Sequence, residues 1–188
     1  MDFSQSVTEI TFTALDFETT GLYPATDKIV ELGAVQFCDA KVLGSFEALV
    51  DPGIPIPDGA AAVSGITTEM VRGKPGIETV MPEFMSFLGD TVLVAHNAQF
   101  DVGFLRASLD AVALPGLTNI IIDTQVLAQR AFPRRKSYAL QALVCELALP
   151  RGHAHRGLDD AIMCMRLFQA CVDSLSFMGE MSLQQLLV

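Results

Sequence analysis

The order of the apolar segments is the feature that most constrains the fold of this chain. Residues 9–17, 29–37 and 45–50 read as strands joined by short turn-like segments, a pattern typical of an antiparallel meander. The apolar runs VLVAH (92–96) and NIIID (119–123) read as buried strands, and each is followed by helical spacing of apolar residues. Strands that alternate with helices pair in parallel. The sequence therefore predicts an α/β fold in which a mixed sheet, a meander followed by parallel strands, is flanked by helices.

Periodic apolar positions predict the helices of this fold. Their ranges are 79–88, 97–109, 124–131, 137–147 and 157–175. Pro82 fits only the first turn of its helix, because proline has no N–H to donate further inside. Asn97 is a candidate N-cap. The Pro- and Gly-rich stretch DPGIPIPDGAAAVSGIT, residues 51–67, is expected to be a long loop.

The length of the chain, 188 residues, suggests one domain with a sizeable core. Residues 8–175 are expected to form it, with an N-terminal tail at 1–7 and a C-terminal tail at 176–188. A hydrophobic content of 51% with 18% charged residues fits a compact globular protein rather than a disordered one. No apolar run reaches the ~18 residues that a membrane span needs, so no membrane partner is expected.

Cysteine usage and the N-terminus point to the cytoplasm. The four cysteines form no CxxC pair and read as small buried hydrophobes in a reducing compartment. The first residues, MDFSQSVTEI, have neither the basic nor the apolar region of a secretory signal. The net charge of −10 argues against a general polyanion-binding surface. A nucleic-acid enzyme stays possible if metal ions neutralise its acidic groups.

The segment TALDFETTGL (13–22) places Asp16 and Glu18 in an otherwise apolar strand. Side chains two positions apart on a strand point to the same face, so both carboxylates aim at one point. Two like charges this close repel unless a positive group lies between them, and a divalent metal that takes carboxylate oxygens is the simplest such group. A pair of solvated acids on an edge strand is the alternative.

Two further clusters carry acids near the ends of predicted elements. Asp101 lies early in the helix after VLVAH, with His96 and Asn97 where that strand ends, the edge at which open α/β sheets bind ligands. His155 precedes the last helix, and Asp160 lies in its first turns near the boundary of the apolar stripe. Taken separately, each cluster is equally consistent with acids that favour the helix dipole.

Together, three motifs resemble the DEDDh branch of the 3′→5′ exonuclease superfamily. They are Asp16-x-Glu18, the run HNAQFD that ends at Asp101, and His155-x4-Asp160, with SGIT (64–67) and the Asp123-Thr124 pair between them. The resemblance covers roughly residues 8–175. The chain is most similar to the proofreading (epsilon) subunits of bacterial replicative DNA polymerases and their stand-alone relatives. It departs from them at Ser64, where many relatives have histidine, and in ending without the long tail that tethers some proofreading subunits to a polymerase.

The resemblance implies a ribonuclease H-like fold and a metal-dependent 3′→5′ exonuclease that releases 5′-mononucleotides from DNA. Asp16, Glu18, Asp101 and Asp160 would hold two divalent ions, Mg²⁺ or Mn²⁺. His155 would act as the general base, because imidazole titrates near neutral pH. The implied substrate-binding residues are Thr19, Thr20, Gly21, Leu22, Ile66, His96, Asn97 and Phe100.

Several alternatives stay open at this point. An exonuclease that trims RNA 3′ ends, or a catalytically silent nucleic-acid-binding module, fits the same motifs. The basic run RRK (134–136) is either a phosphate contact or a solvated loop. The expected partner is a single-stranded or frayed 3′ end of DNA, with RNA possible, and a DNA polymerase or sliding clamp is a further candidate. The C-terminal SLQQLLV faintly resembles a clamp-binding peptide, but a frayed helix end is the favoured interpretation.

Overall fold

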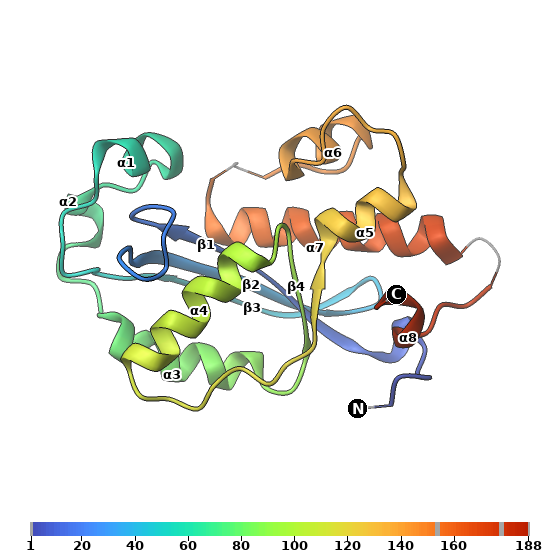
Figure 1. The fold of residues 1–188 in the computed structure, drawn as a ribbon, viewed down its shortest axis with the longest axis horizontal. Helices are drawn as coiled ribbons and strands as arrows, with labels where there is room; N and C mark the ends of the chain where they lie inside the picture. Colours follow the sequence, from blue (N-terminus) through green and yellow to red (C-terminus); the bar gives the residue numbers. More distant parts are fainter. Residues whose placement is uncertain (1, 153–154, 177–178, 188) are drawn as a thin grey trace.

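The computed structural model describes residues 2–152, 155–176 and 179–187 and shows a mixed five-stranded sheet covered by helices (Figure 1). The strand order is β3-β2-β1-β4-β5, with antiparallel β3-β2-β1 pairing and parallel β1-β4-β5 pairing. The strands are β1 (Thr11–Thr19), β2 (Ile29–Cys38), β3 (Lys41–Leu49), β4 (Val92–Ala95) and β5 (Ile121–Asp123). The predicted meander followed by parallel strands is therefore confirmed.

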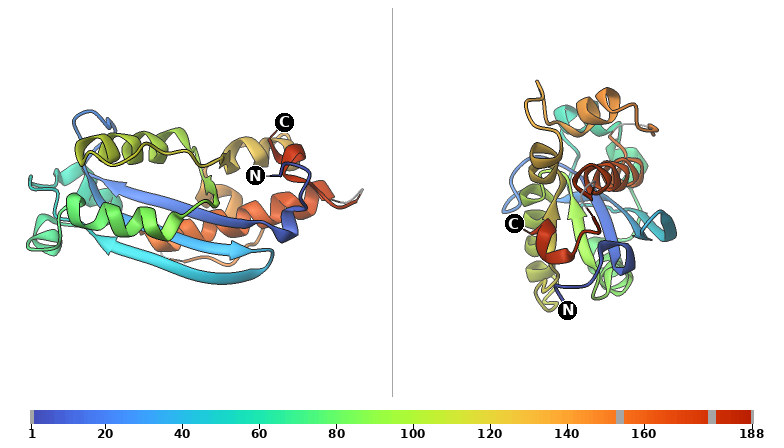
Figure 2. Two further views of the ribbon diagram at one scale, coloured as in Figure 1. Left: turned by 90° about the horizontal axis from the view of Figure 1, so that it is seen from below. Right: turned by 90° about the vertical axis from the view of Figure 1, so that its right-hand side faces the viewer.

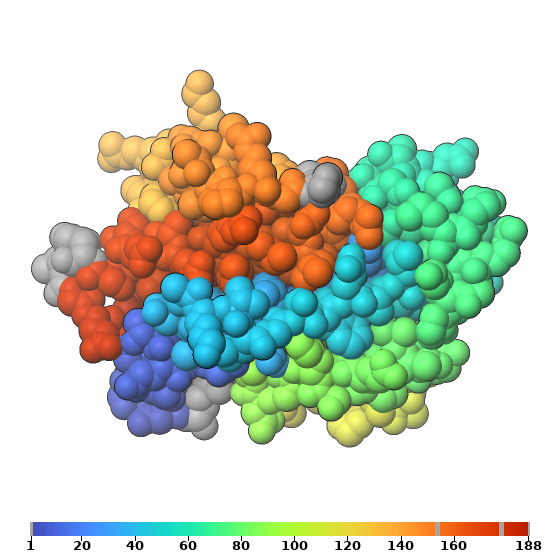
Figure 3. Space-filling view, turned by 180° about the vertical axis from the view of Figure 1, so that it is seen from behind, coloured from blue at the N-terminus to red at the C-terminus, as the bar shows by residue number. Residues whose placement is uncertain are grey.

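The helices form a layer on each face of the sheet. They are α1 (Asp58–Ser64), α2 (Thr68–Val71), α3 (Ile77–Leu88), α4 (Gln99–Ala111), α5 (Thr124–Ala131), α6 (Leu140–Glu146), α7 (Gly157–Leu175) and α8 (Leu183–Leu186), with a 3-10 turn at Val7–Glu9. Helices α3 and α4 cover one face, and α7 covers the other (Figure 2, left). On the back of the molecule, the edge strand β3 lies at the surface between α7 and α3 (Figure 3).

Strand β1 assigns its residues to these layers by simple alternation. Phe12 and Ala14 pack in the cluster under α7, whereas Leu15 and Phe17 pack in the cluster under α3 and α4. The alternation puts the Asp16 side chain on the same face of β1 as Phe12 and Ala14. The face of β1 that packs apolar residues beneath α7 therefore carries carboxylates at the C-terminal end of the strand. This is the end nearest α1 in Figure 1.

A glycine contact brings the start of α7 directly onto the sheet. A Cβ added to Gly33 of β2 would lie 1.9 Å from the carbonyl carbon of Gly157, and one on Gly157 would lie 3.1 Å from the carbonyl oxygen of Asp16. Only residues without a side chain allow two backbones to approach this closely. The contact fixes the first turn of α7 beside β1, and so it sets where Asp160 can reach.

The predictions for residues 51–67 and for the first turn of α3 are wrong. The expected loop at 51–67 contains α1, because Ala60–Val63 are helix-compatible and Ile56, Ile66 and Val71 bury their side chains against Val30 beneath it. Helix α3 begins at Ile77, two residues earlier than predicted, so Pro82 lies in its second turn. Pro82 is exposed there, where water can satisfy the carbonyl that its missing N–H leaves free.

The C-terminal residues fold back onto the N-terminal segment. Leu183 and Leu186 of α8 are 0% and 5% exposed, and the N–H of Val7 donates to the carbonyl of Met181 at 2.9 Å. The Arg130 guanidinium donates to the carbonyl oxygens at the end of α8. The prediction of a frayed helix end is therefore wrong, and the buried leucines are not displayed to a clamp. Among the described residues, no helix is long and apolar enough to cross a membrane.

Candidate active site

The four carboxylates of the sequence motifs meet in one cavity. It has a volume of about 600 Å³, and Asp16, Glu18, Asp101, Asp160 and His155 all line it. Strand β1 supplies the first two residues, the first turn of α4 supplies the third, and the first turn of α7 supplies the fourth. Residues that are up to 144 positions apart in the sequence thus face one another across the end of the sheet.

Hydrogen bonds hold two of the carboxylates in place. The Asp101 Oδ1 atom accepts the N–H of Phe17 at 3.0 Å, which ties α4 to β1. The Asp160 carboxylate accepts the side-chain amide of Gln141 and the N–H of His155, both at 2.6 Å. Oxygens of Glu18 and Asp160 and a ring nitrogen of His155 lie within 4.8 Å of one another.

The cluster concentrates negative charge in a poorly hydrated place. Burial, with the nearby carboxylates of Asp101 and Asp160, raises the pKa of Asp16 well above its ordinary value. Burial raises the pKa of Glu18 to about 7, and the adjacent Asp160 and Glu31 add to this increase. Burial also raises the pKa of Asp101 to about 7, against the lowering effect of the Phe17 hydrogen bond. A positive charge placed among these groups would lower all three pKa values.

The donor set fits a hard divalent cation. Among the residues that the structure describes, none of the four motif carboxylates has an ion pair with lysine or arginine. Carboxylate oxygens are the ligands that Mg²⁺ and Mn²⁺ prefer. Uncompensated buried carboxylates are costly, so the cluster needs a cation of this kind to be ionised without penalty.

Glu31 is a functional candidate that the sequence analysis missed. It lies opposite Glu18 in the β1–β2 register, and its side chain is fully buried. Its carboxylate accepts two N–H groups of Arg156 and the backbone N–H of Gly157, the closest at 2.8 Å. This anchor fixes the two residues that follow His155. The sequence signal that could have identified Glu31 is the presence of an acid inside the apolar run IVELGAVQF.

Removing this anchor gives a stability prediction with a built-in control. Glu31→Ala is expected to lower the free energy of unfolding by about 2 kcal/mol, because the Gly157 N–H loses its acceptor and Arg156 loses its buried partner. Glu47→Ala removes the other, exposed carboxylate that pairs with Arg156, at 3.4 Å, and is expected to cost about 0.5 kcal/mol or less. Urea denaturation measures both, and equal losses would contradict the role given to Glu31.

The N-terminus of α4 is capped by a residue from another strand. Asn97 was the predicted cap, but its backbone is left-handed with φ of 59°, and α4 begins only at Gln99. The Asp123 carboxylate instead accepts the N–H groups of Asn97 and Ala98, at 3.1 and 2.9 Å. Because the two β-strands are parallel neighbours, a residue at the end of β5 can reach the helix that follows β4. The N-cap prediction for Asn97 is therefore wrong.

His96 lines the cavity, but both of its ring nitrogens are hydrogen-bonded to other groups of the protein. Nδ1 lies 2.9 Å from the Thr124 hydroxyl, and Nε2 lies 2.8 Å from the Tyr138 carbonyl, to which it must donate. Burial lowers the pKa of His96, which favours this neutral form. The ring therefore ties the end of β4 to the segment that leads into α6, where Gln141 reaches Asp160.

Most of the predicted substrate-binding residues line the same cavity, with one exception. Those that line it are Thr19, Thr20, Gly21, Leu22, His96, Asn97 and Phe100. Ile66 is 0% exposed in the core beneath α1, so its side chain does not reach the cavity. Val63 of α1, which is 59% exposed, lines the cavity instead. It was missed because its segment was predicted as a loop.

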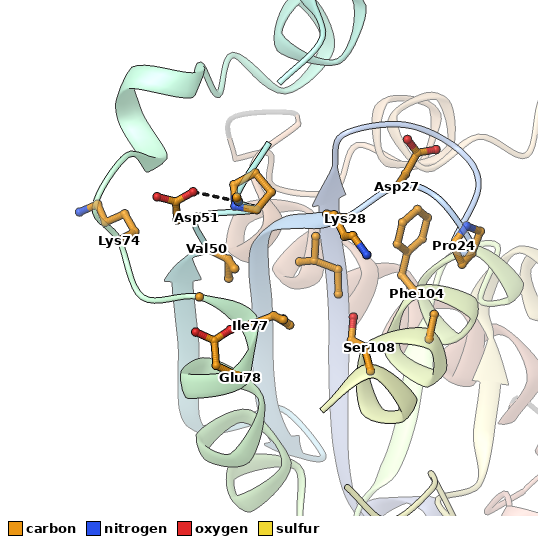
Figure 4. Close-up of a pocket in the computed structure, with 16 residues that line it drawn as sticks. Pro24, Asp27, Lys28, Val50, Asp51, Lys74, Ile77, Glu78, Phe104 and Ser108 are labelled. Atoms are coloured by element: carbon orange, nitrogen blue, oxygen red, sulfur yellow. Dashed lines mark hydrogen bonds between the residues drawn. The ribbon is translucent and has the colours of Figure 1, made fainter. Parts of the chain in front are cut away.

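Two other features lie outside this cavity. In the RRK run, Arg135 pairs with Glu146 at 2.7 Å, while Arg134 and Lys136 are exposed and do not line the cavity. Another cavity of about 440 Å³ lies between the β1–β2 loop, α4 and the start of α3 (Figure 4). Its lining mixes three acids, Asp27, Asp51 and Glu78, with two lysines, and it contains none of the predicted site residues.

Comparison with known proteins decides the family. The model of the family described as Exonuclease matches residues 13–168 of this chain. The chain belongs to the exonuclease family. One relative of this exonuclease, the DNA polymerase III subunit epsilon of Treponema pallidum (strain Nichols), is 40% identical over 165 residues, which cover 87% of this chain and 77% of that protein.

Other proteins that match the exonuclease differ widely in length. The PolC-type DNA polymerase III of Thermotoga petrophila is 37% identical over 186 residues, which cover 99% of this chain but 14% of that protein. The solved structure of Exonuclease X in complex with 5′ overhanging duplex DNA is 32% identical with a TM-score of 0.69, and the match covers 93% of this chain and 97% of that one. Exonuclease I, 20% identical with a TM-score of 0.76 over 89% of this chain and 41% of its own, shares the fold. The predicted ribonuclease H-like fold is confirmed.

Proposed function

We propose that this exonuclease is a metal-dependent 3′→5′ enzyme that releases 5′-mononucleotides from the 3′ end of DNA, as a proofreading activity does. The observation that carries the proposal is the meeting of Asp16, Glu18, Asp101, Asp160 and His155 in one cavity. A silent binding module would not need a cluster of carboxylates that repel one another. The chemistry of the cluster is that of phosphodiester hydrolysis.

The carboxylates of Asp16, Glu18, Asp101 and Asp160 would hold two divalent ions, Mg²⁺ or Mn²⁺. When bound, such ions supply positive charge that stabilises the attacking and leaving oxygens of the phosphodiester. The chain's own contribution is to fix these ligands. Asp101 is oriented by the Phe17 N–H, and Asp160 by Gln141 and the His155 N–H.

His155 would remove the proton from the attacking water. A ring nitrogen of His155 lies within 4.8 Å of carboxylate oxygens of Glu18 and Asp160, so the ring faces the groups that would hold the ions and the attacking water. The backbone of His155 is left-handed with φ of 63°, and its N–H is held by Asp160. Glu31 and Arg156 anchor the residues that follow, so the base is positioned by contacts on its C-terminal side.

Apolar side chains at the rim would bind the terminal base. Leu22 is 72% exposed and Val63 is 59% exposed, and both line the cavity. Exposed apolar surface of this kind packs against bases without sequence preference. The backbone at Thr19–Gly21 borders the same space and would contact the terminal nucleotide.

The relatives support DNA as the substrate and replication as the setting. Exonuclease X was solved with 5′ overhanging duplex DNA, and exonuclease I was solved with a dA16 oligonucleotide. The epsilon and PolC-type relatives are named for DNA polymerase III, so a polymerase is the proposed partner and the cytoplasm the proposed compartment. RNA is the competing substrate to test.

The experiment follows an oligonucleotide labelled at its 5′ end. With Mg²⁺ or Mn²⁺, products shortened one nucleotide at a time from a free 3′ end are expected, and EDTA is expected to abolish them because the carboxylates alone hold no positive charge at the phosphate. A 3′-phosphorylated or otherwise blocked oligonucleotide is the control. Cleavage from the 5′ end, or equal rates in EDTA, would overturn the proposal, and faster digestion of a matched RNA would change the assigned substrate.

A further inference from the structure

A second hollow adjoins the active-site cavity along α4. This outer groove, with a volume of about 510 Å³, is lined on its far side by Pro24, Gln99, Val102, Gly103 and Arg106. It shares Leu22, Asn97 and Phe100 with the active-site cavity. These three residues therefore form the divide between two adjoining spaces, one of which contains the carboxylates.

The charge of the outer groove differs from that of the adjoining active-site cavity. Arg106 is the one ionisable side chain among its lining residues, and no carboxylate lines the groove. Asp110, one helical turn further along α4, is exposed but is not among the lining residues. Arg106 is exposed and has no ion pair or hydrogen bond with any side chain that the structure describes. Asn97 and Gln99, also exposed, add amide donors. In a chain of net charge −10, a groove with a free arginine and no carboxylate suits an anion.

The loop between β1 and β2, which carries Leu22 of this divide, is held by hydrogen bonds. The N–H of Tyr23 donates to the Asp27 carboxylate at 2.8 Å, and the N–H of Asp27 returns to the Tyr23 carbonyl at 2.8 Å. A Cβ added to Gly103 would lie 3.1 Å from the Pro24 side chain, so the loop rests directly on α4. Leu22 is thus held out in solvent by backbone hydrogen bonds, between a space that would hold the terminal nucleotide and a space beyond it.

We propose that the outer groove binds the nucleotides that precede the terminal nucleotide in the same strand. Arg106 contacts one of their phosphates, and Pro24 and Phe100 offer apolar surface to a base. The inference rests on the proposed function, because a strand whose 3′ end occupies the carboxylate cavity must leave it through a connected space. The outer groove adjoins that cavity across Leu22, Asn97 and Phe100, and its one ionisable lining side chain, Arg106, is complementary in charge to the strand.

The test compares Arg106→Gln with Lys41→Gln. Lys41 is exposed and starts β3 at the opposite end of the sheet, so both variants remove one positive charge but only one changes the groove. Arg106→Gln is expected to raise KM for a single-stranded 12-nucleotide DNA by about fivefold. It should leave unaffected a dinucleotide without a 5′ phosphate, in which the scissile phosphate is the only one. The slope of log KM against log salt should fall by about 0.7 for the longer substrate, the value for one phosphate contact in a single strand. Lys41→Gln should match the wild type on both substrates.

Other results would overturn the proposal. Equal effects of the two variants would mean that general charge is responsible, and a loss confined to duplex substrates would assign the groove to the complementary strand. An equal loss on the dinucleotide would place Arg106 at the terminal nucleotide. If the wild type hydrolyses neither substrate, the proposed function fails, and this outcome is distinct from a failure of the groove proposal. Fluorescence anisotropy of the labelled 12-mer, with Ca²⁺ as the ion, still decides whether Arg106→Gln weakens binding more than Lys41→Gln does.

Discussion

The variant Asp160→Ala is expected to lose exonuclease activity by about 10³-fold or more, whereas Asp159→Ala keeps most of the wild-type rate. The two aspartates are adjacent on α7, and one residue of helix turns the side chain by about 100°. Asp160 is 4% exposed and lines the carboxylate cavity. Asp159 points instead toward the loop at Gly152, where an added Cβ would lie 2.7 Å from its Oδ1 atom.

The magnitude follows from what Asp160 does in the site. Its loss would remove one of the proposed ligand oxygens and would release the Gln141 side chain and the His155 N–H, which Asp160 accepts at 2.6 Å. Initial rates on a 5′-labelled oligonucleotide measure the effect, and circular dichroism shows whether both variants are folded. If Asp159→Ala were the inactive one, the third motif would have to be assigned one residue earlier.

The variant His155→Ala is expected to slow turnover by a factor of about 10² to 10⁴ while still binding divalent metal and single-stranded DNA. His155 lies beside Glu18 and Asp160, but a ring that only accepts a proton contributes nothing to holding the ions. Asp16→Ala would instead remove a proposed ligand oxygen, so this variant should bind Mn²⁺ more weakly as well as react more slowly. Calorimetric titration with Mn²⁺ and single-turnover rates separate the two defects.

The nearby histidine is the control for this prediction. His153 has no place in the motif, and His153→Ala is expected to behave as the wild type; its placement is outside the described residues. An equal loss in His153→Ala would show that the base is wrongly assigned. A loss of metal affinity in His155→Ala comparable to that in Asp16→Ala would make this histidine a ligand.

Local patterns in the chain were enough for the fold class and for the first motif. Alternation along β1 follows from the backbone, so Asp16 and Glu18 had to share a face in any extended strand. The long apolar runs and the order of strands and helices gave the mixed sheet for the same reason. The spacing of Asp160 in the first turn of a helix is equally a local property, and the motifs themselves carried the resemblance to the exonuclease family.

Contacts between distant segments decided the rest. Only the tertiary structure shows that Asp123 caps α4 and that Glu31 anchors the start of α7. Nothing in the sequence around Val63 or Arg106 predicts a cavity wall or a free arginine, because both properties depend on which elements pack beside them. The close approach of Gly33 and Gly157 likewise sets where α7 begins on the sheet. Sequence periodicity determines which way a side chain faces within its own element, whereas the position of one element against another is set by backbone contacts that periodicity does not encode.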